Sequence, residues 1–228
     1  MSAQWQAAMF LHTYLLTGKR IGPLQGWPVS PDLGLLLVNL VADESYQAIV
    51  EFGSGTSTML MATANLNLSR SGGALIPQLA FEHLEDFQRN TRQLLKTNRL
   101  EVLVTLIKAP LVPVELEGKT YGYYSCDEEL AKLSADLGDR RLGRPILVLV
   151  GGPPGDTNPK ARYPALHFML KHFPRVGLHL LMDEMVREDE RQIVERWCRE
   201  LTALGREFTK ESFAFDKGAT LLRVSPKS

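Results

Sequence analysis

The chain has 228 residues with 26 basic and 26 acidic side chains, and 44% of its residues are hydrophobic. This length and composition suit one α/β domain with a full core and exclude the disordered and fibrous classes. The formal net charge is zero, so no excess of positive charge favours nucleic acid or an anionic membrane. We expect neither as a partner.

Two sequence features predict where the protein is located. Cys126 and Cys198 lie far apart without a partner motif, which is typical of reduced thiols in a cytoplasmic protein. The apolar stretch 7–16 follows no basic residue and is too short to cross a bilayer. It therefore predicts neither a signal peptide nor a transmembrane helix, and we expect a cytoplasmic location.

The chain is expected to begin with an N-terminal helical cap, residues 1–40, followed by a single compact unit at 41–228. Residues 3–17 predict an amphipathic helix that places Trp5 and Met9 near its buried face. The cap precedes the core and is positioned to cover a ligand cleft. Homodimerisation through its helices stays open at this stage.

A loop rich in glycine and proline, residues 22–31, follows the first helix. Trp27 in this loop is expected to pack against the protein, with a role in covering the cleft as the alternative. Ser30 is expected to cap a second helix, with Pro31 at the first helical position and the end near Leu40.

The most informative stretch is 48–62, which reads as a strand, a tight turn and a helix N-terminus. This arrangement brings backbone N–H groups close to a bound nucleotide. Gly53 and Gly55 suit the turn, because glycine accepts positive φ and lets the backbone approach a ligand. Glu51 ends the strand and is expected to reach into the crevice. An ordinary strand–helix turn is the alternative.

The rest of the chain alternates predicted strands and helices, which implies a mostly parallel sheet with right-handed crossovers. A terminal hairpin is expected to add an antiparallel strand. The segments 65–78 and 112–144 are expected to be irregular apart from one short helix. The expected strands are 47–52, 79–81, 102–107, 145–150, 177–182, 208–215 and 219–224. One helix is expected to run from the glycine turn to about Ala64, and the others are expected at 85–97, 127–137, 163–172 and 188–204.

An acidic residue, Glu82, follows the second expected strand. In a nucleotide-binding sheet the acid at this position hydrogen-bonds ribose hydroxyls, with a simple surface carboxylate as the alternative. The third glycine of a dinucleotide fingerprint is missing, because Thr58 stands where it would fall. This departure disfavours a nicotinamide cofactor.

Several segments in the right order resemble class I S-adenosylmethionine (SAM) methyltransferases, in particular a bacterial subgroup that acts on small molecules and sugars. Residues 51–57 resemble the first SAM motif, and 81–83 resemble the second. Residues 150–155, Val-Gly-Gly-Pro-Pro-Gly, resemble the "DGPPG" stretch of that subgroup, as do 162–166 and the pair Asp183-Glu184. The resemblance implies an α/β, doubly wound, seven-stranded sheet with an antiparallel last strand.

The same resemblance implies roles for individual residues. The cradle for the methionine part of SAM would be Glu51, Gly53, Ser54 and Gly55, with Ser57 also among the cofactor-binding residues. Glu82 would hold the ribose and His83 would border the adenine. The floor beside the reactive methyl group would consist of Gly152 and Pro153.

One departure from the subgroup concerns metal. Gly151 stands where an aspartate usually precedes Gly-Pro-Pro, and in catechol-type relatives that aspartate helps to bind magnesium beside the carboxylates of strand 5. Because a hard cation needs several oxygen ligands, we expect no metal. A catalytically silent binding module is a possible consequence of the same change.

Candidate catalytic and acceptor-binding residues follow the glycine–proline segment. Asp183, Glu184 or His167 can act as the base for a hydroxyl or ammonium acceptor, with Tyr163 as an orienting donor. Arg162 can clamp an anionic acceptor, and Tyr123 belongs to an aromatic segment, 121–124, that can form an acceptor-binding flap. Alternatives are helix capping for the two acids, a surface position for His167 and Arg162, and a satellite core for the tyrosines.

We therefore predict a SAM-dependent methyltransferase that acts on a small-molecule or sugar-derived acceptor without metal and releases S-adenosylhomocysteine (SAH). A catalytically silent SAM-binding or assembly module is the alternative from a different class. A nicotinamide-dependent oxidoreductase is less favoured, because the third glycine is missing.

Overall fold

The computed structural model describes residues 3–15, 29–138 and 143–227. Its helices are α1 (Ala3–Leu15), α2 (Pro31–Asp43), α3 (Thr56–Arg70), α4 (Glu85–Thr97), α5 (Asp127–Leu137), α6 (Pro164–His172) and α7 (Glu188–Ala203). The main strands are β1 (Ala48–Phe52), β2 (Gln78–Glu82), β3 (Val104–Lys108), β6 (Ile146–Val150), β7 (Leu178–Asp183), β8 (Phe208–Phe213) and β9 (Ala219–Val224). A separate hairpin consists of β4 (Leu111–Leu116) and β5 (Lys119–Tyr124).

The seven main strands form one sheet in the order β3-β2-β1-β6-β7-β9-β8. Neighbouring strands from β3 to β7 pair in parallel, and β9 pairs antiparallel with both β7 and β8. The predicted fold class is therefore confirmed, with β9 inserted between β7 and β8. Since the chain leaves β1 in one direction and returns to its other side with β6, the ligand crevice is expected at the carboxyl ends of these two strands.

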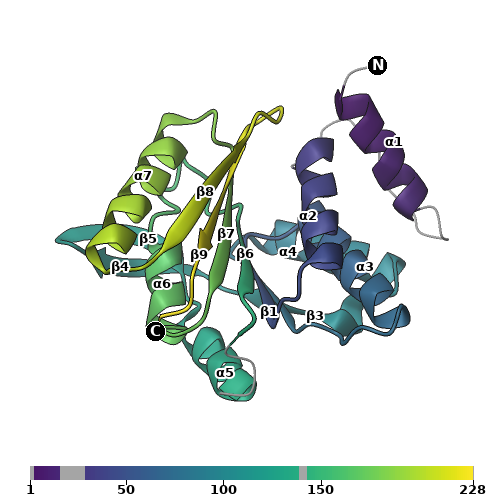
Figure 1. The fold of residues 1–228 in the computed structure, drawn as a ribbon, viewed down its shortest axis with the longest axis horizontal. Coiled ribbons are helices and arrows are strands. Elements are labelled where there is room, and N and C mark those ends of the chain that lie inside the picture. The colour runs from purple at the N-terminus through teal and green to yellow at the C-terminus, as the bar shows by residue number, and fades with distance from the viewer. Residues whose placement is uncertain (1–2, 16–28, 139–142, 228) are drawn as a thin grey trace.

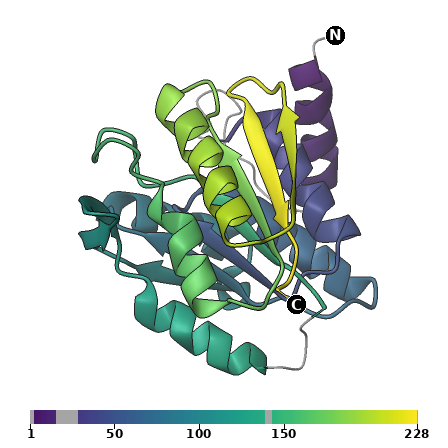
Figure 2. The same ribbon diagram turned by 60° about the vertical axis from the view of Figure 1, so that its left-hand side comes forward.

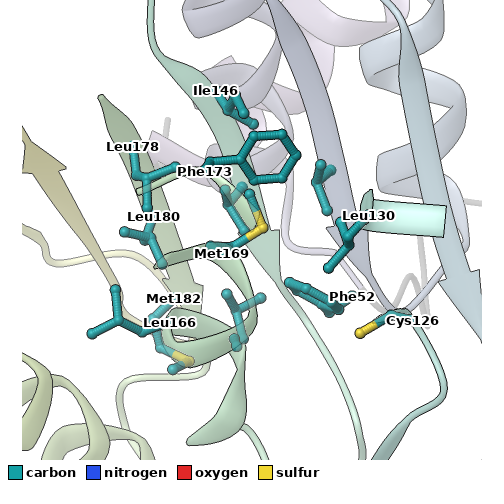
Figure 3. Packing of buried hydrophobic residues seen from close by; sticks show 14 of the residues in the cluster. Phe52, Cys126, Leu130, Ile146, Leu166, Met169, Phe173, Leu178, Leu180 and Met182 are labelled. Atoms are coloured by element: carbon teal, nitrogen blue, oxygen red, sulfur yellow. The ribbon is translucent and has the colours of Figure 1, made fainter. Parts of the chain in front are cut away.

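Helices cover both faces of the sheet (Figures 1 and 2). One face packs against α5, α6 and α7, and Figure 3 shows side chains such as Leu130, Met169 and Phe173 meeting the strand residues Phe52 and Leu180. The other face packs against α2, α3 and α4. Because both faces are covered, β1, β2 and β6 are buried along their whole length, and β6 consists of apolar residues alone.

The segment after the glycine turn differs from the prediction. Helix α3 continues to Arg70, so the expected loop at 65–78 is wrong over its first half. Asn65 explains the extension, because its buried amide donates to the Ile76 carbonyl at 2.7 Å and accepts from the Ile76 N–H at 2.9 Å. These two bonds satisfy a polar side chain inside the core and fix the return to β2.

The long segment after β3 also contains structure that the sequence analysis missed. Strands β4 and β5 pair antiparallel, with Leu111 opposite Tyr124 at one end and Leu116 opposite Lys119 at the other. Their turn contains Glu117 and Gly118, which have φ angles of 49° and 72°. The hairpin brings the tyrosines of β5 against α6 and the end of β1.

At the N-terminus, α1 packs through a different face from the one predicted. Trp5 and Met9 are 65% and 57% exposed, whereas the small residues Ala7 and Ala8 are buried with Leu11. Helix α2 lies between α1 and α3 (Figure 1) and belongs to the core cluster of that sheet face. The predicted packing of Trp27 lies outside the described residues.

Two smaller predictions also change. The side chain of Ser30 makes no capping bond to α2 and donates instead to Asp32 Oδ1 at 2.5 Å. The third strand begins at Val104, because a short 3-10 helix at Glu101–Leu103 precedes it.

Within the described segments, no helix has the length and apolar character needed to cross a membrane. Cys126 and Cys198 are both free thiols.

Candidate active site

A cavity of about 210 Å³ lies at the carboxyl ends of β2, β1, β6 and β7. This is the crevice that the strand order predicts. Residues far apart in the sequence meet there, and they include most of the expected cofactor-binding residues. Its lining comprises Val29, Leu33, Glu51, Gly53, Ser54, Ser57, Glu82, His83, Leu84, Phe87, Tyr124, Leu149, Gly151, Gly152, Pro154, Asp183, Glu184 and Lys217.

A second cavity, of about 390 Å³, lies between α5 and the amino-terminal parts of β2 and β3. Its lining mixes apolar side chains such as Leu79 and Leu133 with the charged groups of Lys132 and Asp136. We take the smaller cavity as the candidate site, because ligands of open α/β sheets bind at the carboxyl ends of the strands.

The glycine turn forms one wall of the site. Gly53 has a φ of 104°, and a β-carbon there would lie 3.3 Å from the Gly152 nitrogen. Its own N–H donates to the Phe81 carbonyl at 2.9 Å. Glycine is therefore required at position 53 both by the backbone conformation and by the closeness of the β6 turn.

Glu51 stabilises this turn through hydrogen bonds to the start of α3. One carboxylate oxygen accepts from the Thr58 hydroxyl at 2.7 Å, and the other accepts from the Ser57 hydroxyl. Thr58 in turn accepts from the Gly55 N–H at 2.9 Å, which satisfies the start of α3. Burial raises the pKa of Glu51 to about 7, and the Glu82 charge acts in the same direction against the two hydroxyl bonds.

The end of β2 forms the next wall. Glu82 accepts from the Leu84 N–H at 2.9 Å and from the Ser54 hydroxyl at 3.2 Å. Ser54 is also 3.0 Å from the Thr91 hydroxyl of α4. His83 Nδ1 lies 3.3 Å from Glu82 Oε1, but the two atoms are not in hydrogen-bonding geometry. The Glu82 carboxylate is thus held in the lining of the cavity by neighbouring groups.

The β6 turn lies between these walls and β7. The N–H groups of Gly151 and Gly152 both donate to the Phe52 carbonyl, at 3.0 and 2.7 Å. A β-carbon on Gly152 would lie only 2.2 Å from the Tyr124 hydroxyl oxygen. Gly152 lines the cavity, while Gly55 and Pro153 are not among the described residues that line it.

Asp183 ends β7, Glu184 follows it, and both line the cavity. Asp183 Oδ1 accepts from the Glu184 N–H at 2.7 Å. Burial raises the pKa of Asp183 to about 6, and the Glu184 charge adds to the rise while its N–H opposes it. Glu184 has a φ of 59°, a strained conformation for a residue with a long side chain. Such strain at a strand end is common at functional sites.

Arg162 lies behind this wall and is almost completely buried. Its guanidinium donates to Glu184 Oε2 at 2.5 Å, to the Asp183 carbonyl at 3.2 Å and to the Pro153 carbonyl at 3.3 Å. Burial alone would raise the pKa of Glu184, but the charge and hydrogen bond of Arg162 hold it below its ordinary value. Arg162 therefore joins the β6 and β7 turns and does not present a free guanidinium to the cavity.

Three other expected site residues lie outside the cavity lining. The Tyr163 hydroxyl donates to Glu200 of α7, and His167 Nε2 lies 3.2 Å from the same carboxylate. Tyr123 is fully buried with its ring stacked on Phe168 at 5.6 Å, and its hydroxyl has no partner among the described groups. The structure therefore brings Asp183 and Glu184 to the crevice but not Tyr163, His167 or Tyr123.

Sequence reasoning missed several residues that line the cavity. Tyr124 belongs to the β4–β5 hairpin, and Lys217 belongs to the turn between β8 and β9. This turn is held against the end of β7, because the Lys217 and Gly218 carbonyls accept from the N–H groups of Val186 and Met185. Leu33 comes from the cap helix α2. The aromatic segment 121–124 is the one signal for these residues in the sequence, and it predicts Tyr123 in place of its neighbour.

The donor groups do not fit a magnesium site. Gly151 supplies no ligand, and the Glu184 carboxylate is occupied by Arg162 and by Arg187 at 3.2 Å. Among the described residues, no group of three His, Cys, Asp or Glu side chains could hold a metal ion. A hard cation would have to displace two arginines from its best ligand.

No protein-family model and no curated protein matches the sequence, but solved structures share its fold. An O-methyltransferase from Bacillus cereus in complex with SAH is 16% identical, with 99% of this chain and 93% of that chain covered at a TM-score of 0.59. The O-methyltransferase TomG from Streptomyces achromogenes, involved in tomaymycin synthesis and solved with SAM, is 18% identical, with 99% and 100% covered at 0.57. The N-terminal domain of human METTL16 in complex with SAH is 14% identical, with 99% and 82% covered at 0.56.

These likenesses show the fold. The chain has the Rossmann-like fold of the SAM-dependent methyltransferases, with one antiparallel strand next to the edge of a mostly parallel sheet.

Proposed function

We propose that the protein is a SAM-dependent methyltransferase that acts on a small-molecule or sugar-derived acceptor. The observation that carries the proposal is the cavity itself, in which the Gly53 turn, the Glu82 carboxylate and the Asp183 carboxylate face one space at the carboxyl ends of adjacent strands. Such a crevice at the switch point is the usual place for a nucleoside ligand in this fold.

The residues present fit the cofactor. Glu82 lines the cavity with a carboxylate that suits ribose hydroxyls, and His83 and Phe87 line it with rings that suit adenine. Gly53 and Gly152 lie so close together that a β-carbon on Gly53 would be 3.3 Å from the Gly152 nitrogen, and both glycines present their backbone to the cavity. Glu51, Ser54 and Ser57 supply polar groups for the methionine part, and we include Gly55 and Pro153 as backbone neighbours of these groups.

The strand order divides the cavity into two halves. If Glu82 on β2 holds the ribose, the β7 side, with Asp183, Glu184 and Lys217, is left for the acceptor. Leu33 of α2 gives the cavity an apolar wall, which is the covering role proposed for the cap at residues 1–40.

When bound, SAM supplies a methyl group on a positively charged sulfur, so the protein needs only to orient the acceptor, exclude water and remove a proton where the acceptor carries one. Asp183 is the best-placed base, because its pKa of about 6 leaves it ionised at neutral pH while still able to accept a proton. Glu184 is held by Arg162 and keeps the strand end in place. We assign no catalytic role to Tyr163 or His167.

We further propose that the reaction uses no metal, because the Glu184 carboxylate is committed to two arginines. The absence of net charge supports a small acceptor over a nucleic acid. A cytoplasmic location without membrane contact agrees with the reduced thiols and stays part of the proposal.

Calorimetric titration of the purified protein with SAM, SAH and NAD tests the cofactor. We expect micromolar binding of SAM and SAH, no binding of NAD, and SAH binding weakened at least tenfold in Glu82→Ala, because charged hydrogen-bond partners contribute about 1.5–3 kcal/mol. Equal SAH affinity in the variant, or binding of NAD alone, would overturn the assignment.

Turnover then separates the enzyme from a silent SAM-binding module. We expect conversion of SAM to SAH with a panel of hydroxyl, amine and carboxylate acceptors, and loss of the hydroxyl reaction in Asp183→Asn. A protein that binds SAM but transfers no methyl group to any acceptor would favour the binding module.

A further inference from the structure

Tyr124 is the one aromatic residue of the β4–β5 hairpin that lines the crevice among the residues that the structure describes. It ends β5, and its ring lies over Phe52 at a centroid distance of 6.2 Å with an interplanar angle of 25°. The His83 ring meets its edge at 5.6 Å. The residue therefore sits between the end of β1 and the end of β2.

The hydroxyl of Tyr124 lies against Gly152, which also lines the cavity. It occupies the space over Gly152 so closely that a β-carbon there would be 2.2 Å away. Burial raises the pKa of the Tyr124 hydroxyl well above its ordinary value. The charges of Glu82 and Glu51 raise this pKa further, and the charge of Arg162 lowers it. The phenol therefore stays protonated at every physiological pH and is available as a hydrogen-bond donor.

The hairpin that carries this side chain is anchored on three sides. The Gly122 N–H donates to Asn158 Oδ1 at 2.9 Å, and Glu117 at the hairpin turn pairs with Arg196 of α7. The Ser125 N–H donates to the Pro110 carbonyl at 2.9 Å and closes the base. A side chain held on a rigid support loses little entropy when it binds a ligand.

We propose that Tyr124 is a ligand-binding residue whose hydroxyl donates a hydrogen bond to the nucleoside part of the bound cofactor, beside Glu82. This inference rests on the proposed function. It also explains why position 152 is glycine, since any side chain there would displace the hydroxyl. The same geometry removes Tyr123 from the site, because its hydroxyl is enclosed and lines no part of the cavity.

Two adjacent tyrosines give a matched test. The variants Tyr124→Phe and Tyr123→Phe each lose one oxygen from a buried ring of the same hairpin, and only the first loses an oxygen that faces the cavity. Calorimetry should measure the affinity of each for SAH and for 5′-methylthioadenosine, which lacks the amino-acid part. Melting temperatures should be recorded beside the titrations.

We expect Tyr124→Phe to bind both ligands about tenfold more weakly, the size expected for one lost hydrogen bond, and Tyr123→Phe to stay within about twofold of the natural protein. Unchanged binding in Tyr124→Phe would overturn the proposal. So would a loss confined to SAH, because the contact would then be to the amino-acid part. A natural protein that binds neither ligand would instead refute the proposed function.

Discussion

Arg162 donates to Glu184 Oε2 at 2.5 Å, and this buried ion pair joins the β6 and β7 turns at the edge of the cavity. Glu190 of α7 adds a second buried carboxylate 3.5 Å from the same guanidinium. Arg187 crosses over Gly155, where a β-carbon would lie 1.6 Å from its Nη2. The wall that presents Asp183 therefore depends on a set of opposite charges around the buried Arg162 guanidinium.

The Arg162→Met variant should lose about 2 kcal/mol of unfolding free energy, because Glu184 and the buried Glu190 each lose one of the two arginines that pair with them. Urea denaturation checks this, with Arg89→Met as the control. Arg89 pairs with Asp86 and Glu85 on an exposed helix surface, where such pairs contribute about 0–1 kcal/mol. Equal losses in the two variants would show that the buried network contributes nothing special.

Glu51 should make stability depend on pH. Its pKa is about 7 in the folded chain against 4.5 when unfolded, so between these values the folded state binds more protons. The contribution is therefore complete below about pH 4.5 and is lost as the pH rises through 7. At full ionisation the loss amounts to about 3 kcal/mol.

The measurement compares unfolding free energies of the natural protein and Glu51→Gln from pH 4.5 to 8. The unfolding free energy of the natural protein minus that of Glu51→Gln should fall as the pH rises through this range, because Glu51 ionises and glutamine stays neutral. Glu85→Gln serves as the control, since Glu85 is exposed and its pKa is lowered mainly by its bond to Lys108. A difference for Glu51→Gln that does not change with pH would mean that Glu51 ionises normally.

Most of the fold could be predicted because the strands are short apolar runs separated by helices with clear patterns. Residues next to strand ends, such as Glu82 and Asp183, could be placed for the same reason, since parallel strands bring their carboxyl ends together. The predicted end of helix α3 is too early because the last turns of the helix are polar. The hydrogen bond that fixes this region joins Asn65 to the Ile76 carbonyl, 11 residues further along the chain.

The rest of the site could not be predicted from local pattern. Pro113 lies inside β4, and proline argues against a strand unless the strand is at an edge. Without the hairpin, no periodicity could show that Tyr124 and not Tyr123 reaches the cavity. The face of α6 that carries His167 is likewise set by its packing on α7, where Glu200 receives it.

Gly151→Asp should fold normally, because a β-carbon at position 151 meets only the Phe52 carbonyl, at an ordinary 3.7 Å. We expect a change in unfolding free energy within about 0.5 kcal/mol, the range of ordinary surface substitutions. Magnesium binding, followed by calorimetry, should stay in the millimolar range, because Arg162 still occupies Glu184. Micromolar magnesium binding would show that the two arginines release the carboxylate and that the site descends from a metal enzyme.

Gly152→Ala should cost about 2 kcal/mol of unfolding free energy, because the added methyl group overlaps the Tyr124 hydroxyl at 2.2 Å and the ring is held by Phe52. Gly151→Ala is the matched control and should cost less than about 0.5 kcal/mol, since its β-carbon lies in ordinary contact.

The double variant Gly152→Ala with Tyr124→Phe should recover part of the loss, because removing the hydroxyl frees the space that the methyl group needs. Urea denaturation of the four proteins gives the coupling free energy directly. Strictly additive losses would mean that Tyr124 does not lie against Gly152 in solution. Recovery of stability without recovery of SAH binding is the expected combination, because the double variant still lacks the hydroxyl donor.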